Sequence, residues 1–276
     1  MNNKNYSTSQ NKRKFDYKAC MEDVNKDLNL SVIKAFRLLD TYLNDKQEWG
    51  VRELAKKTGY NKTTTYRLLS TLEYLDVVQK NDNDKYILGL KLFELGNLVS
   101  IHKSLRSYSR IPLENIAKEI KETVHLGVLR NDQVLYLNKA ESPLGLKVST
   151  QIGSYQEAYC TALGKILLAF SSTNQISDYL KNVKLKARTS NTITNSEDLL
   201  LELKKVKEKV YALDMEELEL GLICIAIPVF NKKKEVIASI SVSGPSSRFK
   251  PENITSYLSI IKKGALEIEE HISDYN

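Results

Sequence analysis

The sequence contains few of the residues that mark unusual architectures. Its 276 residues include three cysteines, five prolines and eleven glycines. The low proline and glycine content excludes collagen-like and linker-rich chains. Three scattered cysteines (Cys20, Cys160 and Cys224) cannot build a disulfide framework, so we expect reduced thiols.

Long apolar segments are also missing. The longest nearly apolar run, residues 221–230, is far shorter than the roughly 20 residues that a membrane-spanning helix needs. The polar N-terminus lacks the apolar segment of a secretory signal. We therefore expect a cytoplasmic protein that has no membrane partner.

Motifs for catalysis and metal binding are absent from the sequence. The three histidines lie far apart, and no paired-cysteine or His-Glu-x-x-His spacing occurs. Gly164-Lys165 is similar to the end of a phosphate-binding loop, but Ile166 replaces the Ser or Thr and Tyr159 replaces the first glycine. We expect no enzyme activity, no cofactor and no metal; the alternative is a thiol enzyme that uses Cys160 or Cys224.

Positive charge is concentrated in the first third of the chain. Residues 1–91 hold 17 Lys and Arg against 12 Asp and Glu, whereas residues 92–276 hold 24 against 22. A basic segment joined to a nearly neutral body is typical of a nucleic-acid reader with a separate second module. The alternative is a generally lysine-rich surface.

Three helical segments follow the N-terminal tail. Apolar residues recur at steps of three and four over residues 32–43, which predicts an amphipathic helix. A second helix over residues 51–58 is expected to end at Gly59, and Asn61 is a good N-cap for a third. The inner face of this third helix is predicted to carry four apolar side chains: Tyr66, Leu69, Leu72 and Leu75.

The second and third helices have the layout of a DNA-reading helix-turn-helix. Free N–H groups at the start of the third helix favour phosphate, and short hydroxyl and basic side chains there can reach base edges. Strand-like residues 77–80 and 86–88 flank a turn, which predicts a hairpin wing. The predicted DNA-binding residues are Lys62, Thr63, Thr64, Thr65, Tyr66, Arg67, Lys80 and Lys85. The alternatives are a solvated three-helix bundle and a winged helix that binds protein.

The remaining residues are predicted to form a linker helix and a mixed domain. Residues 90–110 suggest a helix, and Pro112 marks the break at which we place the domain boundary. Strand-like segments then alternate irregularly with helical ones, which is typical of an α+β domain. The predicted strands are 124–129, 134–137, 145–150, 224–229 and 236–242, and the predicted helices are 162–170, 196–210 and 254–272. The predicted organisation is a disordered tail (1–28), a winged helix-turn-helix (29–90), a linker helix (91–110) and a C-terminal domain (111–276).

Three stretches share the pattern of a known family. Residues 59–69 (GYNKTTTYRLL) are similar to its recognition helix, and residues 161–169 (TALGKILLA) are similar to the mouth of its effector pocket. Asp214 with residues 217–230 and 241–248 (SVSGPSSR) matches its C-terminal signature most sharply. From about Leu30 to its end, the chain therefore resembles the IclR family of bacterial transcriptional regulators. One departure is Asn61, which stands where the family often has proline and serves the same helix start.

The resemblance implies an α+β fold, with an N-terminal winged helix-turn-helix and a C-terminal GAF-like α/β domain whose sheet is mainly antiparallel. It implies an operator in double-stranded DNA, a homodimer or a dimer-of-dimers tetramer, and a small-molecule effector. The implied function is a sequence-specific regulator, in our interpretation a repressor, whose operator affinity is controlled by a small metabolite, often a carboxylate. The implied effector-binding residues are the backbone groups of Ala162 and Leu163 and the side chains of Asp214, Cys224, Ser241 and Ser243.

The residue types suit such a pocket. Ser241 and Ser243 are two apart on a predicted strand, so their side chains share one face. The helix beginning near Thr161 would offer N–H groups and a positive dipole end to a carboxylate. Alternatively, Cys224 is a plain core residue and Asp214 only braces a loop. A redox-sensing regulator, switched by oxidation of Cys160 or Cys224, is the alternative function.

Overall fold

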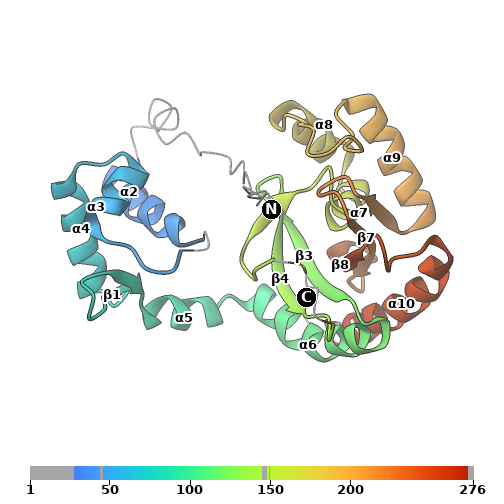
Figure 1. The fold of residues 1–276 in the computed structure, drawn as a ribbon, viewed down its shortest axis with the longest axis horizontal. Helices are drawn as coiled ribbons and strands as arrows, with labels where there is room; N and C mark the ends of the chain where they lie inside the picture. The colour runs from blue at the N-terminus through green and yellow to red at the C-terminus, as the bar shows by residue number, and fades with distance from the viewer. Residues whose placement is uncertain (1–27, 44–45, 145–147, 149, 273–276) are drawn as a thin grey trace, which may run out of the picture. The chain divides into compact units, whose positions relative to one another are not determined.

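The computed structural model describes residues 28–43, 46–144, 148 and 150–272. The described residues divide between Gly96 and Asn97 into two compact units (Figure 1). The predicted tail lies outside the described residues except for Leu28. None of the described helices is long and apolar enough to cross a membrane.

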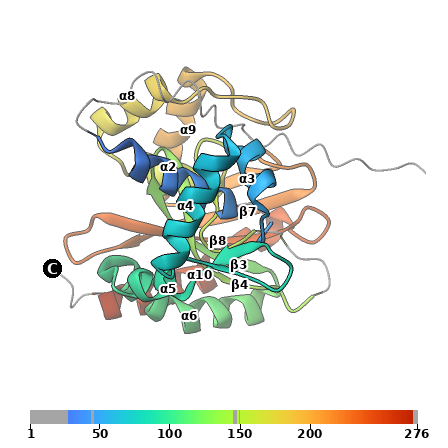
Figure 2. The same cartoon turned by 90° about the vertical axis from the view of Figure 1, so that its left-hand side faces the viewer.

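The first unit is the predicted winged helix-turn-helix. Its elements are α2 (Leu30–Leu39), η1 (Asp40–Leu43), α3 (Val51–Thr58), α4 (Lys62–Tyr74), β1 (Val78–Lys80) and β2 (Tyr86–Leu88). Gly59 ends α3 with a left-handed φ of 75°, and Asn61 caps α4 by accepting a hydrogen bond from the backbone N–H of Thr64 at 2.7 Å. Figure 2 shows α4 with α2 and α3 on either side, and β1 and β2 pair as an antiparallel hairpin.

The buried face of α4 is turned relative to the predicted one. Leu69 is buried as predicted, but the predicted inner residues Tyr66 and Leu75 are 56% and 52% exposed. Thr65 was predicted to face outward, which is wrong, because it is fully buried. Its hydroxyl donates a hydrogen bond to the carbonyl of Asn61 at 3.0 Å, so the polar group is satisfied inside the helix turn.

The apolar stripe of the first helical segment is only partly covered. Leu38 and Tyr42 are buried, whereas Val32, Phe36 and Leu43 are exposed. The unit has too few elements to cover both sides of α2. An apolar surface therefore remains beside the core of this unit.

The predicted linker helix is two helices, α5 (Leu90–Asn97) and α6 (Ser100–Ile120). Helix α6 runs through Pro112, so the predicted helix end and boundary at this proline are wrong. The apolar residues that follow, Leu113 and Ile116, are buried in the core of the second unit. This burial outweighs the single backbone hydrogen bond that proline cannot donate.

The second unit is built on a six-stranded antiparallel sheet in the order β5-β4-β3-β8-β7-β6. The strands are β3 (Thr123–Arg130), β4 (Gln133–Ala140), β5 (Tyr155–Glu157), β6 (Ala212–Met215), β7 (Leu222–Phe230) and β8 (Val236–Pro245). The helices are α7 (Ala162–Ala169), α8 (Thr173–Asn182), α9 (Ser196–Lys209), η2 (Pro251–Asn253) and α10 (Ile254–Ile272). The mainly antiparallel α/β fold is confirmed, and α10 has its predicted bounds. The predicted strand 145–150 lies mostly outside the described residues, and Val148 and Thr150 belong to no strand.

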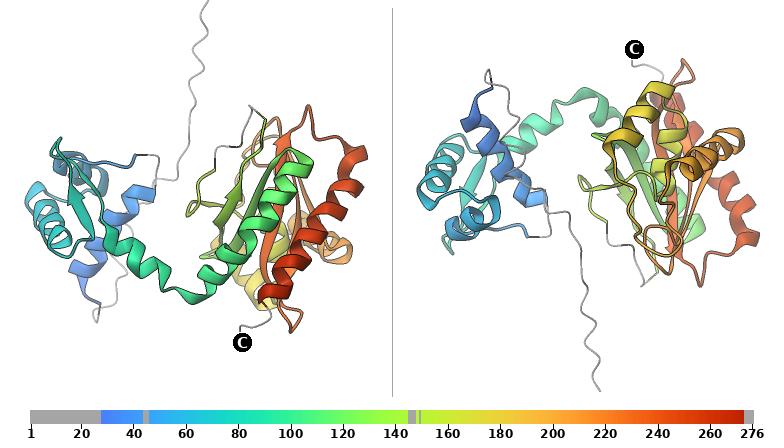
Figure 3. Two further views of the ribbon diagram at one scale, coloured as in Figure 1. Left: turned by 90° about the horizontal axis from the view of Figure 1, so that it is seen from below. Right: turned by 90° about the horizontal axis from the view of Figure 1, so that it is seen from above.

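The two faces of the sheet carry different side chains. Helices α6 and α10 lie side by side along one face (Figure 3), where alternate strand residues such as Leu126 and Ile240 are apolar and buried. Helix α7 packs on the opposite face, with α9 against it. There the intervening residues of β3 and β8 are often polar, as at His125 and Ser241. The sheet therefore offers a buried polar surface beneath α7.

Close packing of α7 leads to a stability prediction. A Cβ atom on Gly164 would come within 2.2 Å of the carbonyl oxygen of Ala158, so Gly164→Ala must displace the helix. We expect this substitution to lower the free energy of unfolding by about 1–3 kcal/mol, measured by urea denaturation. Gly96→Ala is the control, because no atom lies within 4 Å of its added Cβ. Wild-type stability in Gly164→Ala would contradict the packing.

Candidate functional site

The N-terminal end of α4 presents a polar surface. Lys62, Thr63, Tyr66 and Arg67 are exposed and Thr64 is half-buried, so only Thr65 among the predicted α4 residues is hidden. Within the described part of the chain, neither Lys62 nor Arg67 forms a salt bridge. Their charges, together with the free N–H groups of the first helical turn, are available to an external anion.

The two lysines of the wing are paired inside the unit. Nζ of Lys80 lies 2.7 Å from a carboxylate oxygen of Asp84, and Nζ of Lys85 lies 2.6 Å from Glu48. Both pairs are at the surface, where ion pairs contribute little to stability. A phosphate group can therefore replace these carboxylates at small cost.

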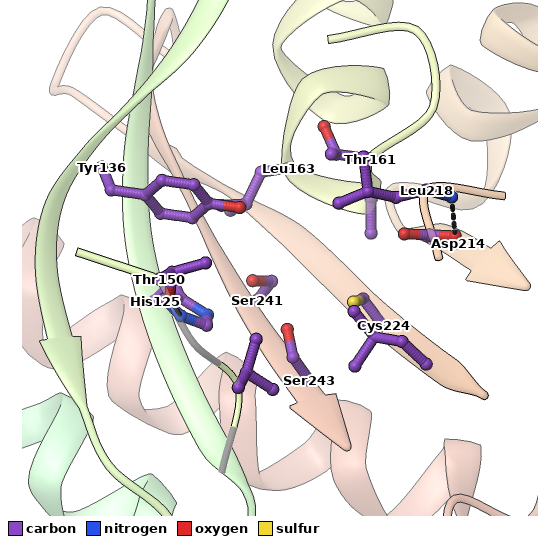
Figure 4. Close-up of a pocket in the computed structure, with 13 residues that line it drawn as sticks. His125, Tyr136, Thr150, Thr161, Leu163, Asp214, Leu218, Cys224, Ser241 and Ser243 are labelled. Atoms are coloured by element: carbon purple, nitrogen blue, oxygen red, sulfur yellow. Dashed lines mark hydrogen bonds between the residues drawn. The ribbon is translucent and has the colours of Figure 1, made fainter. Parts of the chain in front are cut away.

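The second unit contains a small cavity between α7 and the sheet (Figure 4). All six predicted effector-binding residues line it. Sequence reasoning missed the remaining lining residues, which are His125, Tyr136, Val148, Thr150, Thr161, Leu218 and Leu222.

Strand register gathers the polar residues on the floor of the cavity. Asp214 on β6 is directly opposite Cys224 on β7, which in turn is opposite Ser243 on β8. In the adjacent row, Ser241 is opposite His125 on β3. Because side chains alternate along each strand, both rows face α7. The missed histidine could have been found from β3 itself, in which polar and small residues alternate with apolar ones.

The start of α7 forms the opposite wall. The hydroxyl of Thr161 accepts a hydrogen bond from the N–H of Gly164 at 3.2 Å and donates one to the carbonyl of Glu157 at 2.9 Å. The helix itself provides no partner for the N–H groups of Ala162 and Leu163. These two residues line the cavity, so their N–H groups make it suitable for an anion.

One carboxylate oxygen of Asp214 holds the segment after β6 in place, and the other is left without a hydrogen bond. Its Oδ1 atom accepts hydrogen bonds from the N–H groups of Glu217 at 2.7 Å and Leu218 at 3.4 Å, whereas Oδ2 has no partner. Burial, and to a smaller extent the negative charge of Glu217, raises the pKa of Asp214 to about 7. At neutral pH the group can therefore accept a hydrogen bond when ionised or donate one when protonated.

Comparison with known proteins agrees with this arrangement. The family model described as the IclR helix-turn-helix domain matches residues 31–82, and the model described as the C-terminal part of bacterial transcriptional regulator IclR matches residues 99–270. The chain belongs to the IclR family. Its first unit is the DNA-binding helix-turn-helix domain of an IclR-type transcriptional regulator, and its second is the IclR C-terminal domain.

Three relatives illustrate the relation to other IclR proteins. The HTH-type transcriptional regulator KdgR of Escherichia coli is 38% identical over 239 residues, which are 86% of this chain and 90% of KdgR. The crystal structure of the Thermotoga maritima IclR has a TM-score of 0.70 at 33% identity, covering 87% of this chain and 97% of that one. An IclR homologue from Microbacterium hydrocarbonoxydans, complexed with 4-hydroxybenzoate, has a TM-score of 0.81 at 20% identity, covering 88% and 98%, and shows the shared fold alone.

The lysine of the IclR-like segment TALGKILLA is structural. Lys165 is 1% exposed, and its Nζ donates hydrogen bonds to the carbonyl of Leu213 at 2.8 Å, to Glu202 at 3.2 Å and to the carboxylate of Glu217. Its charge is therefore already matched by acceptors outside the cavity. An anionic ligand would depend on N–H groups and on Asp214 instead.

The buried thiols give no support to redox sensing. Burial raises the pKa of both Cys160 and Cys224, and the negative charges of Glu157 near Cys160 and Asp214 near Cys224 raise it further. Thiolate is the reactive form of cysteine, so both side chains are poor targets for oxidation. Cys20 lies outside the described residues. No group of three or more metal-ligating side chains occurs among the residues that the structure describes.

The raised pKa of Asp214 predicts a pH-dependent stability. Between its usual value of 3.8 and about 7 the folded state holds the proton and the unfolded state releases it, so stability falls as pH rises through this range. Relative to Asp214→Asn, the wild type should lose a few kcal/mol from pH 4 to about pH 7, at about 1.4 kcal/mol per pKa unit. Urea unfolding at a series of pH values measures this difference.

A second substitution controls for the loss of one negative charge. Asp178→Asn removes a carboxyl on α8 whose side chain is 66% exposed. The same pH series on this variant gives the general effect of the change in net charge. A pH-independent difference between the wild type and Asp214→Asn would contradict the assigned environment of Asp214.

Proposed function

We propose that the protein is a metabolite-responsive repressor: α4 reads an operator, and a small carboxylate bound beneath α7 changes operator affinity. Two features together support this proposal. In the first unit, α4 presents a polar and positively charged surface. In the second unit, a cavity with polar residues on the sheet is bounded by free N–H groups at the start of α7. The proposed role places the protein with chromosomal DNA in the cytoplasm. The unit up to Gly96 would serve DNA binding, and the unit from Asn97 onward would serve effector binding.

The DNA-binding proposal rests on the surface of α4. Lys62 and Arg67 supply charge for phosphates or guanine edges, and Thr63 and Thr64 supply short donors and acceptors at the helix start. Tyr66 adds an exposed ring and hydroxyl on the same helix. Lys80 and Lys85 in the wing would contact the neighbouring backbone after exchanging their carboxylate partners. Thr65 is no longer part of the proposed interface, because it is buried.

The effector proposal rests on the chemistry of the cavity. The N–H groups of Ala162 and Leu163 suit a carboxylate, and protonated Asp214 can donate a further hydrogen bond. Ser241, Ser243 and Cys224 supply small polar groups along the floor. The cavity is small, which favours a compact metabolite.

Self-association is supported by the apolar surface of the first unit. Large exposed side chains occur on or beside α2 and along α5: Leu30, Val32, Phe36, Leu43, Leu90, Phe93 and Leu95. Groups of exposed apolar side chains commonly mark interaction surfaces. A homodimer formed through these side chains would place two copies of α4 on adjacent major grooves about 34 Å apart. A second interface would extend this dimer to a tetramer. The effector would act by favouring one relative placement of those helices.

Replacement of Arg67 tests the recognition helix. Arg67→Ala should weaken binding to operator DNA, selected by the wild-type protein from random duplexes, by about 1–3 kcal/mol and should relax base preference at one position. Lys205→Ala, which removes an exposed cation from α9, is the control. Equal operator affinity of wild type and Arg67→Ala in a fluorescence anisotropy titration would remove this side chain from the interface.

Replacement of Ser243 tests the cavity. Carboxylates such as pyruvate, gluconate and 4-hydroxybenzoate are screened for a raised melting temperature and for release of operator DNA. Ser243→Ala should bind the selected acid about tenfold more weakly, because one hydrogen bond is lost, while its DNA affinity without ligand stays unchanged. Ser247→Ala, on the exposed turn after β8, should behave as wild type. If no carboxylate alters operator affinity, the proposed signal is wrong.

A further inference from the structure

Two buried polar atoms of the cavity lack a partner in this protein. They are Nδ1 of His125 and Oδ2 of Asp214, and both residues are about 1% exposed. Unsatisfied buried groups are rare in native proteins because each loses its hydrogen bonds to water without replacement. Two such atoms in the lining of one cavity indicate positions at which a ligand completes the hydrogen bonding.

The two residues belong to opposite ends of the site. His125 is on β3 and Asp214 on β6, three strand steps apart, which corresponds to roughly 14 Å between backbones at about 4.8 Å per step. Figure 4 shows His125 with Tyr136 at one side of the cavity and Asp214 at the other, with Ser241 between them. A short acid such as pyruvate bound beside Asp214 would leave the histidine end unmatched.

The chemistry at the His125 end suits a neutral group. Nε2 of His125 lies 2.5 Å from Oγ1 of Thr150, which fixes the ring and leaves Nδ1 as its remaining polar atom. Burial, and then the positive charge of Lys139, lowers the pKa of His125 to about 3, so the ring is neutral. The ammonium of Lys139 donates hydrogen bonds to the carbonyls of Val148 and Thr150, at 3.0 Å each. This end therefore offers a hydrogen bond rather than a charge.

We propose that His125 is a specificity-determining residue, which binds a hydroxyl group at the end of the effector remote from its carboxylate. A hydroxyl group both donates and accepts, so it pairs with Nδ1 in either tautomer of the ring. The effector class is thus an elongated hydroxy acid that reaches from Asp214 on β6 to His125 on β3. This inference rests on the proposed function, since it takes the cavity to be the effector site.

Matched pairs of acids and matched variants test the inference. The probes are 4-hydroxybenzoate with benzoate, and hexanoate with its derivative hydroxylated on the last carbon. Calorimetric titration of the full-length protein should show about fivefold to tenfold tighter binding of the hydroxylated member of at least one pair, the size expected for one hydrogen bond. His125→Gln keeps a polar atom near the Nε2 position beside Thr150, whereas His125→Asn keeps one near the Nδ1 position.

The two variants should therefore separate the roles of the ring nitrogens. His125→Gln should lose the preference for the hydroxyl group, and His125→Asn should keep it; melting curves establish that both are folded. A preference kept in His125→Gln and lost in His125→Asn would mean that the ring acts only through Thr150, which overturns the inference. Acids that bind without a hydroxyl preference overturn it too, and leave the proposed function standing. If no acid binds at all, the carboxylate effector and this inference both fail.

Discussion

The ammonium group of Lys165 is buried between α7 and the segment that joins β6 to β7. Its acceptors are the carboxylate of Glu202 on α9 and, from β6 and the segment after it, the carbonyl of Leu213 and the carboxylate of Glu217. A buried charge that loses its partners costs several kcal/mol, so α7 and this segment stay where the acceptors meet the lysine. The N–H groups at the start of α7 and the carboxyl of Asp214, which both line the cavity, are thereby held in a fixed relation.

The residues of the family signatures fall into two groups, those that face the cavity and those that hold its walls in place. Ser241 and Ser243 face the cavity, whereas Arg248 at the end of the same signature forms a bidentate ion pair with the buried carboxylate of Glu122, at 2.7 and 2.8 Å. In the α7 segment, Thr161 caps the helix and Gly164 permits its close approach to the neighbouring backbone. Most of these signature residues shape the walls, and few are free to contact a ligand. Their spacing reflects strand register and helix capping as much as ligand chemistry.

Local sequence patterns predicted the long helices and strands. The short elements and the buried faces depend on contacts between distant parts of the chain. Helix α10 was predicted to the residue because its apolar stripe is long and continuous. Strands β5 and β6, of three and four residues, are too short for a periodic signal, and helix α8 was also missed. The α4 face was misjudged because Thr65 hides its hydroxyl in a local hydrogen bond, so a polar residue fills an inner position. The alternation along β3 places His125 on the polar face of the sheet, but its position beside Ser241 depends on strand pairing, which is not a local pattern.

A cavity that leaves polar atoms unsatisfied makes the second unit less stable than its packing would allow. A ligand that supplies the missing partners binds the folded state alone and stabilises it by mass action. The stabilised elements include the start of α7 and the β6–β7 segment, which Lys165 holds together. A small molecule can shift a conformational equilibrium only by its difference in affinity for the two states. The unsatisfied atoms of His125 and Asp214 would be a physical source of that difference, since a ligand that contacts both would bind only the arrangement that brings them together.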